Sequence, residues 1–344
     1  MYKISRVIIF GDSCSDIGNM YNRALSNLPQ VKLNDYGRFS DGKNWVDFFW
    51  ESVGGELFYR EDVKKTVEKS KKHLRLATGG SWPRGKMELA NYAEGGATAL
   101  HSSDGQDWGG WFASGVLSTL KDEVAKYMED RKKDTSRVFA DSQTLFIIWI
   151  GANDVVTVNR DPSAMPKVAE YVFETAQNLL NEASGSHVVI VGLPDPQFMP
   201  RFFDPKKDAE ARKVDTNHRK KISTGASNFN NRLAQLVTAQ VKIQHLFNKS
   251  TLEFFDIGQI LTPKFLAKQG FAPFAQPDTF KPGDRVGKNV LKAPLLTYTD
   301  TALDEDFLYG TVSDKLHPSE GVYATIAEVL TSYFQKSCYF DFKP

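Results

Sequence analysis

The sequence predicts an α/β protein in which a parallel β-sheet carries helices on both faces. The first support is a set of short apolar runs, each ending in small or turn-forming residues: 7–10, 145–150, 188–191, 252–257 and, more weakly, 87–93. Nearly continuous apolar runs are typical of parallel strands that are buried on both faces. The second support is that helical patterns lie between these runs, because strands that alternate with helices form parallel sheets.

The helical patterns are clearest in three stretches. In 166–183, apolar residues recur at intervals of three and four, and Gly185 then suits a C-terminal cap. The same spacing recurs in 229–241 and 320–334. Since functional sites in such sheets form where strands end and loops begin, we expect the chemistry of this protein at the strand ends.

The chain has 344 residues, which is long for one domain but suits a single α/β domain with insertions. Because no internal repeat or linker is apparent, we expect one domain over 1–344. The predicted surface insertions are at about 55–85, 100–115, 200–225 and 265–310.

The charge balance gives no reason to expect a nucleic-acid partner, because 43 Lys and Arg residues stand against 42 Asp and Glu, a net charge of +1. The charged stretches 61–75 and 205–221 are interpreted as solvated helix faces, with a surface for lipid headgroups as the alternative. The stretch 270–300 has no clear period and is interpreted as a long loop, either a lid or an insertion.

No apolar run approaches the roughly 18 residues of a membrane span. The first predicted strand follows the N-terminus almost directly, and no signal peptide is visible. A cytoplasmic protein, a protein exported without a cleaved leader and a trimmed chain all remain open. The two cysteines, Cys14 and Cys338, lie near opposite ends, so we expect no disulfide framework.

Ser13 is the first candidate for chemistry. It lies in Gly11-Asp12-Ser13-Cys14-Ser15, directly after the first predicted strand. We expect it to open a helix, whose dipole would favour developing negative charge, and an ordinary N-cap is the alternative. The stretch is not a G-x-S-x-G elbow, because Ser15 replaces the second glycine. Cys14 is interpreted as a small packing residue.

A candidate base for Ser13 lies near the other end of the chain. His317 follows Asp314 by three residues, just before the helical pattern at 320–334. A serine hydroxyl needs a base within hydrogen-bond reach, and histidine is the usual one. An aspartate three residues earlier can turn its carboxylate back onto the imidazole, although a loop that carries an N-cap remains the alternative.

The other histidines have less to recommend them. His101 follows Gly96 by a few residues but has no acid before it in a D-x-x-H arrangement. The remaining four lie in charged or ordinary polar contexts, and we expect them on the surface: His73, His187, His218 and His245.

Two further strand ends offer hydrogen-bond donors for an oxyanion. Gly95 and Gly96 follow one predicted strand, and glycine lets a backbone N–H approach a ligand closely. Asn153 follows another strand within Gly151-Ala152-Asn153-Asp154. Together with the N–H of Ser13, these groups would surround one oxygen, although each stretch also suits an ordinary turn. Asp154 adjoins this block and is the second choice after Asp314 for the acid.

Four blocks at 11–13, 91–96, 151–154 and 314–318, in this order, resemble the GDSL (SGNH) family of serine hydrolases. The resemblance extends from residue 7 to about 334. It implies a flavodoxin-like, three-layer α/β/α sandwich. It also implies Ser13 as nucleophile, His317 as base and Asp314 as the residue that orients the base. The implied oxyanion hole consists of Ser13, Gly96 and Asn153, and neither a metal nor another cofactor is implied. The chain departs from the family name at Cys14, where the family often has Leu.

The flanking blocks resemble the bacterial lipase branch of this family, which includes glycerophospholipid:cholesterol acyltransferases, thermolabile haemolysins and secreted effector acyltransferases. The matching blocks are 15–21, 36–45, 91–98 and 192–195. The resemblance implies a phospholipase A or lysophospholipase that meets a membrane surface transiently, with acyl transfer to a sterol or another alcohol as a second outcome. A protein activator is left open as a partner. The resemblance also favours a bacterial protein exported to act outside the producer or in a host cell, with a cytoplasmic protein as the alternative.

Trp108, Trp111 and Phe112 are candidates for an apolar lip that holds an acyl chain, with a core-packing turn as the alternative. Two other functions stay open on the same fold. One is a carbohydrate O-deacetylase or a thioesterase that uses the same triad. The other is a binding module without activity, which an intact set of catalytic residue types makes the least favoured interpretation.

Overall fold

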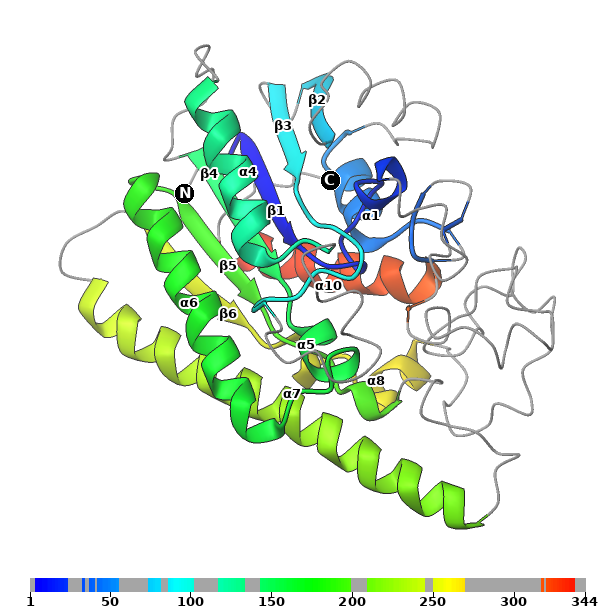
Figure 1. Ribbon diagram of the computed structural model, residues 1–344. Coiled ribbons are helices and arrows are strands. Elements are labelled where there is room, and N and C mark those ends of the chain that lie inside the picture. Colours follow the sequence, from blue (N-terminus) through cyan, green and yellow to red (C-terminus); the bar gives the residue numbers. More distant parts are fainter. Residues whose placement is uncertain are drawn as a thin grey trace.

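The structure is a computed structural model (Figure 1). It describes residues 4–23, 33–34, 37–40, 42–55, 74–81, 86–101, 117–133, 143–198, 209–244, 250–269, 317–318 and 320–337.

A six-stranded sheet forms the centre of the molecule, with the strand order β2-β3-β1-β4-β5-β6. The strands are β1 (Arg6–Gly11), β2 (Leu74–Ser81), β3 (Lys86–Asn91), β4 (Thr144–Trp149), β5 (His187–Val191) and β6 (Thr251–Phe255). All neighbouring strands from β3 to β6 pair in parallel, whereas β2 pairs antiparallel with β3 at the edge. Every residue of β1, β4 and β5 is buried, which explains their continuous apolar sequences.

Strand β2 was not expected from the sequence. It lies in the stretch 55–85 that we predicted as a surface insertion, and it takes in the last two residues of 61–75, which we interpreted as part of a helix face. Its sequence, LRLATGGS, contains two glycines, and its register with β3 shifts between Ala77 and Ser81. Such an edge strand has no continuous apolar run, so periodicity alone does not reveal it.

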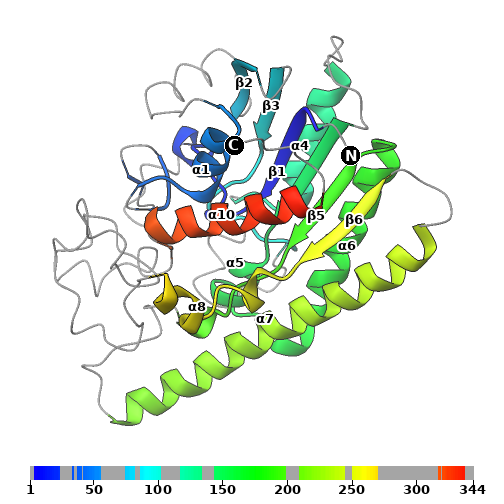
Figure 2. The ribbon, with the colours of Figure 1, turned by 180° about the vertical axis from the view of Figure 1, so that it is seen from behind.

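Helices cover both faces of the sheet and give three layers (Figures 1 and 2). Helices α4 (Leu120–Lys133) and α6 (Met165–Glu182) lie on one face, and α1 (Trp45–Ser52) and α10 (Glu320–Lys336) lie on the other. The expected helices at 166–183 and 320–334 correspond to α6 and α10. This arrangement confirms the predicted α/β/α sandwich.

Helix α7 (Ala209–Gln244) is 36 residues long and runs beside α6 and β6 along one side of the molecule (Figure 2). It joins into one helix the charged stretch from residue 209 onward and the apolar pattern at 229–241, which look separate in the sequence. The shorter helices are α5 (Ala152–Val156) and α8 (Pro263–Lys268), with 3-10 turns at Met20–Asn22, Pro162–Ala164, Pro196–Phe198 and Ile257–Gln259. Within the described residues, no helix is long and apolar enough to cross a membrane.

The order of the parallel strands places the candidate site. If β2 is set aside, the five parallel strands taken in chain order are arranged 2-1-3-4-5, which is the flavodoxin-like order. The chain adds strands first on one side of β1 and then on the other. The crevice outside the carboxyl ends of β1 and β4 is therefore the topological switch point, where ligands bind in such sheets.

Candidate active site

The turn that carries Ser13 follows β1 without a helix, which corrects the expectation that Ser13 opens one. The Asp12 carboxylate accepts a hydrogen bond from the Cys14 N–H at 3.1 Å, and the Asp12 carbonyl accepts from the Ser15 and Asp16 N–H groups, each at 3.0 Å. The two backbone bonds close a single turn, and the Asp12 side chain accepts from the N–H two residues later, so Asp12 rather than Ser13 takes the capping position. Ser13 is consequently not an N-cap.

Gly11, at the end of β1, is needed for the close approach of β1 to β4. A Cβ atom at this position would lie 2.4 Å from the backbone oxygen of Trp149. The Gly11 N–H donates to the buried carboxyl group of Glu123 in α4, at 2.9 Å. These contacts fix the end of β1, and so place Ser13 at the switch point.

Asp16 organises the rest of the turn, a role that is not apparent from the sequence. Its Oδ1 accepts from the N–H groups of Gly18 and Asn19 at 2.7 and 2.6 Å, and its Oδ2 accepts from those of Met20 and Gly95 at 3.0 and 2.8 Å. Burial raises the pKa of Asp16 to about 6. The bond to Gly95 joins the turn after β1 to the turn after β3. The signal in the sequence was an aspartate two residues before Gly18, a common turn pattern.

Ser13 and His317, which are far apart in the sequence, are in contact. The distance from Ser13 Oγ to His317 Nε2 is 2.8 Å, and each residue is only 6% exposed. His317 lies just before α10, so the position of that helix on the sheet sets the position of the imidazole. The ring of Phe39 lies against the imidazole, with a distance of 5.1 Å between ring centroids.

The candidate oxyanion donors lie at the ends of β3 and β4. Gly96 has a φ of 81°, which favours glycine, and a Cβ atom there would lie 2.9 Å from the side chain of Leu117. Asn153 donates through Nδ2 to the carbonyl of Ala97 at 3.0 Å, and its Oδ1 accepts from Thr157 at 2.8 Å. These two bonds fix the amide and leave one of its two N–H groups for a ligand. Among the described residues, no hydrogen bond uses the backbone N–H of Ser13 or Gly96.

Asp154, the second choice for the acid, has its carboxylate hydrogen-bonded to neighbouring loops. Its carboxylate accepts from the N–H groups of Ala99 and Leu100 at 2.7 and 3.4 Å, and from Nε of Arg160 at 2.9 Å. Burial raises its pKa, and the Arg160 charge opposes this shift. The carboxylate makes no hydrogen bond to His317 within the described part of the chain. Asp154 therefore secures the loop after β4 to the turn after β3.

The structure corrects one expectation about the other histidines. His187, which we expected on the surface, is fully buried at the start of β5, and its Nδ1 lies 2.9 Å from Thr251 Oγ1. Periodicity missed it because it is the first residue of an interior strand, next to a polar loop. His218 is half-buried in α7 and His101 is exposed, while His73 and His245 lie outside the described residues.

Several predicted site residues also lie outside the described residues. They are Asp314, Trp108, Trp111 and Phe112, and the same holds for the loop at 270–300. In the part of the chain that the structure describes, no group of three or more His, Cys, Asp or Glu side chains is placed to hold a metal ion.

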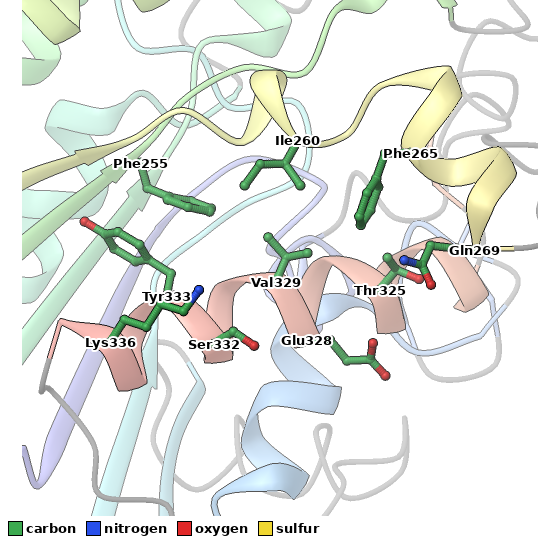
Figure 3. A pocket seen from close by; sticks show the side chains of 10 residues that line it. All are labelled: Phe255, Ile260, Phe265, Gln269, Thr325, Glu328, Val329, Ser332, Tyr333 and Lys336. Carbon is green, nitrogen blue, oxygen red and sulfur yellow. The ribbon is translucent and has the colours of Figure 1, made fainter.

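A separate cavity of about 340 Å³ lies between α8, the end of β6 and α10 (Figure 3). Its apolar lining includes Phe255, Ile260 and Val329, and its polar lining includes Glu328 and Lys336. Neither Ser13 nor His317 lines it, so it is distinct from the cluster at the switch point.

The fold and this cluster define the class: an α/β protein with a serine and a histidine in contact at the switch point, the pairing that serine hydrolases build on several unrelated folds. The chain belongs to the GDSL-like lipase/acylhydrolase family, because that family model matches residues 7–330.

Two curated relatives are similar over part of the chain. A phosphatidylcholine-sterol acyltransferase from Aeromonas hydrophila is 25% identical over 191 residues, covering 56% of this chain and 45% of the relative. A thermolabile hemolysin from Vibrio parahaemolyticus is 24% identical over 201 residues, covering 58% of this chain and 36% of the relative. The match therefore spans less than half the length of either relative.

Two solved structures align with almost the whole chain. An extracellular lipase from Streptomyces rimosus has a TM-score of 0.43 and 14% identity, with 95% of this chain and 99% of that chain covered. A phospholipase A1 from Streptomyces albidoflavus has a TM-score of 0.41 and 12% identity, with 96% and 99% covered.

Proposed function

We propose that this protein is a serine-dependent acyl hydrolase of ester lipids, a phospholipase A or lysophospholipase, with Ser13 as its nucleophile. The observation that carries the proposal is the 2.8 Å contact between Ser13 Oγ and His317 Nε2. A weak nucleophile needs a base at this distance, and the pair lies at the switch point of the sheet. Membership of the lipase/acylhydrolase family supports an ester substrate.

In the first step, Ser13 Oγ attacks the ester carbonyl carbon while His317 Nε2 takes the hydroxyl proton. The carbonyl oxygen becomes an oxyanion, which the N–H groups of Ser13 and Gly96 and the second Nδ2 hydrogen of Asn153 would stabilise. The backbone donors are suited to this role because their N–H groups make no other hydrogen bond within the described residues.

In the second step, the tetrahedral intermediate collapses, and His317 returns its proton to the departing alcohol oxygen of the glycerolipid. The acyl group stays on Ser13 as an ester. Water then attacks this acyl-enzyme with His317 as base and releases a fatty acid. If a sterol or another alcohol attacks instead, the product is a new ester, and the name of the Aeromonas relative supports this second outcome.

Asp314 is proposed to orient His317 and to stabilise its imidazolium form. Asp154 is the less suitable acid, because the backbone of the preceding turn and Arg160 already occupy its carboxylate. We expect Asp314→Asn to lower kcat by a factor of about 10³–10⁴, as a wrong tautomer does in serine hydrolases. Steady-state kinetics of this variant beside Asp154→Asn test the assignment, and a larger kcat loss in folded Asp154→Asn would reverse it.

The central test compares two neighbouring substitutions. Ser13→Ala should lower kcat/KM for a phospholipid ester by at least about a thousandfold, because it removes the nucleophile. Cys14→Ala is the matched control, since it changes the same turn, and it should stay within about threefold of the wild type. Far-UV circular dichroism should be the same for both. Full activity of Ser13→Ala would refute the proposal.

The substrate class is tested with vesicles of phosphatidylcholine and cholesterol. Mass spectrometry after incubation should detect fatty acid and lysolipid, and cholesteryl ester if transfer also occurs. A chain-length series of p-nitrophenyl esters tests the alternative of a carbohydrate O-deacetylase or thioesterase. Preference for the acetate ester, with no product from vesicles, would favour that alternative.

The proposal also includes the expectations that lie outside the described residues. Trp108, Trp111 and Phe112 would form an apolar lip for the acyl chain during transient contact with a membrane surface. Export to act outside the producing cell is part of the same proposal, and so is a protein activator. Activity on vesicles without any added protein would make an activator unnecessary.

A further inference from the structure

Phe39 contacts the proposed base. Its ring and the imidazole of His317 are 5.1 Å apart between centroids, and their planes are inclined by 33°. Phe39 is 6% exposed, so water has little access to this contact. One face of the imidazole therefore lies against an aromatic ring, while its Nε2 edge faces Ser13 Oγ.

The same ring also contacts the turn that carries the proposed oxyanion donor Gly96. A Cβ atom built on Gly95 would lie 2.3 Å from Cε2 and 2.4 Å from Cζ of Phe39, so the ring edge occupies the space of a Gly95 side chain. The Gly95 N–H also donates to Asp16 at 2.8 Å. Gly95 thus contacts both an aromatic ring and a carboxylate.

The backbone around Phe39 is itself fixed. The guanidinium group of Arg38 is fully buried and donates to both carboxylate oxygens of Asp47 in α1, at 3.0 and 2.5 Å. Such a two-point pair sets direction as well as distance. The Arg38 N–H and carbonyl are both bonded to Asn34, each at 3.0 Å.

The residues after Phe39 are tied to the helix that follows His317. Glu320, in the first turn of α10, accepts from the Lys43 N–H at 3.2 Å. A Cβ atom on Gly42 would lie 2.4 Å from the Glu320 carboxyl carbon. Residues 38–40 and 42–44 thus connect α1, α10 and the turn after β3, and Phe39 is the side chain that they place in the site.

We propose that Phe39 is a positioning residue that holds the imidazole of His317 and the Gly95–Gly96 turn at a fixed spacing. The inference rests on the proposed function. A base and an oxyanion donor must both be correctly positioned when the substrate reacts. A misplacement of about 1 Å can lower a rate by about a hundredfold. One rigid ring in contact with both parts meets that requirement and takes no part in proton transfer.

The first test separates positioning from general stability. Phe39→Leu should lower kcat by about 10–100-fold and leave KM within about twofold, because chemistry is affected more than binding. Phe49→Leu is the matched control, since Phe49 is a fully buried aromatic in α1 whose ring packs on Phe334 and Trp45. It should reduce the melting temperature while leaving kcat within about threefold. Equal kcat values for the two variants would overturn the proposal.

The second test probes the contact from the other side. Gly95→Ala adds a methyl group that overlaps the Phe39 ring, and Gly95 does not have a positive φ, so the overlap is the main effect. We expect Gly95→Ala to lower kcat by about tenfold or more in the wild type, and by less than about threefold when it is added to Phe39→Ala. Phe39→Val replaces Phe39→Ala in the cycle if the alanine variant does not fold.

Additive losses in this cycle would overturn the proposal, because they would mean that the ring and the turn act independently. The outcome can be told apart from failure of the proposed function. If the wild type has no esterase activity above that of Ser13→Ala, the function itself is wrong. If the wild type is active and Phe39→Leu matches it, only the positioning role is wrong.

Discussion

At the scale of single residues, Ser13 and Cys14 are neighbours with different chemistry. Burial raises the pKa of the Cys14 thiol well above its usual value, and the Asp12 carboxyl group beside it adds to the shift. Because the thiolate is the reactive form of cysteine, this shift disfavours reaction of Cys14 at neutral pH. The hydroxyl of Ser13 is the group in contact with His317. This difference supports Cys14 as a packing residue.

Asp12 leads to a prediction about pH and stability. Burial raises its pKa from 3.8 to about 7. Between these values the folded state binds a proton that the unfolded chain has lost, so the contribution of Asp12 to stability is greatest below pH 3.8 and is lost as the pH rises to 7. Asp12→Asn should remove this dependence. As the pH rises, the free energy of unfolding of the wild type, measured relative to that of the variant, should therefore fall by up to about 1.4 kcal/mol per pH unit. Urea denaturation of both proteins from pH 4.5 to 7.5 measures the difference, and parallel pH curves would contradict the prediction.

At the scale of secondary-structure elements, the sequence predicted what depends on local pattern. Strands β1, β4 and β5 are buried on both faces, so their apolar runs and approximate ends were visible. The helix expected at Ser13 was wrong, because the Asp16 side chain accepts from the N–H groups of Gly18 and Asn19, which a continuing helix would pair with backbone carbonyls. Side-chain capture of this kind depends on three-dimensional placement and leaves only a weak signal in sequence.

The pairing of β5 with β6 yields a second prediction about pH. Burial lowers the pKa of His187 from 6.5 to about 4, so the folded state keeps the ring neutral where the unfolded chain would bind a proton. Its contribution to stability is present above pH 6.5 and is lost as the pH falls to 4. His187→Gln should destabilise the protein at pH 7.5 by about 1–3 kcal/mol through lost packing. That difference should shrink by more than about 1 kcal/mol at pH 4.5. Chemical denaturation at the two pH values measures it, and an unchanged difference would exclude neutral burial of His187.

At the scale of the whole molecule, the topology assembles the site. Ser13, Gly96 and Asn153 follow β1, β3 and β4, which are adjacent in the sheet, while His317 comes from the segment before α10. The sequence predicted these residues because each follows a strand or precedes a helix, and the order of four blocks matches one family. It could not predict Phe39 or Asp16, whose roles come from contacts between segments that are distant in the chain.

The continuity of the sheet gives the last prediction, which concerns the number of folding units. Hydrogen-bonded strands run without interruption from β2 to β6, and a single apolar cluster extends from Phe49 and Phe334 on the face of α1 and α10 to Val172 and Leu233 in α6 and α7. We therefore expect residues 1–344 to unfold in one cooperative transition. Far-UV circular dichroism reports strongly on α6 and α7, whereas the fluorescence of the six tryptophans includes that of the buried Trp45, Trp50 and Trp149. The two urea transitions should coincide in midpoint and slope, because loss of either side exposes the shared core. If ellipticity is lost at a lower urea concentration than the fluorescence changes, the side of the molecule with α6 and α7 unfolds separately and the single-domain prediction is wrong.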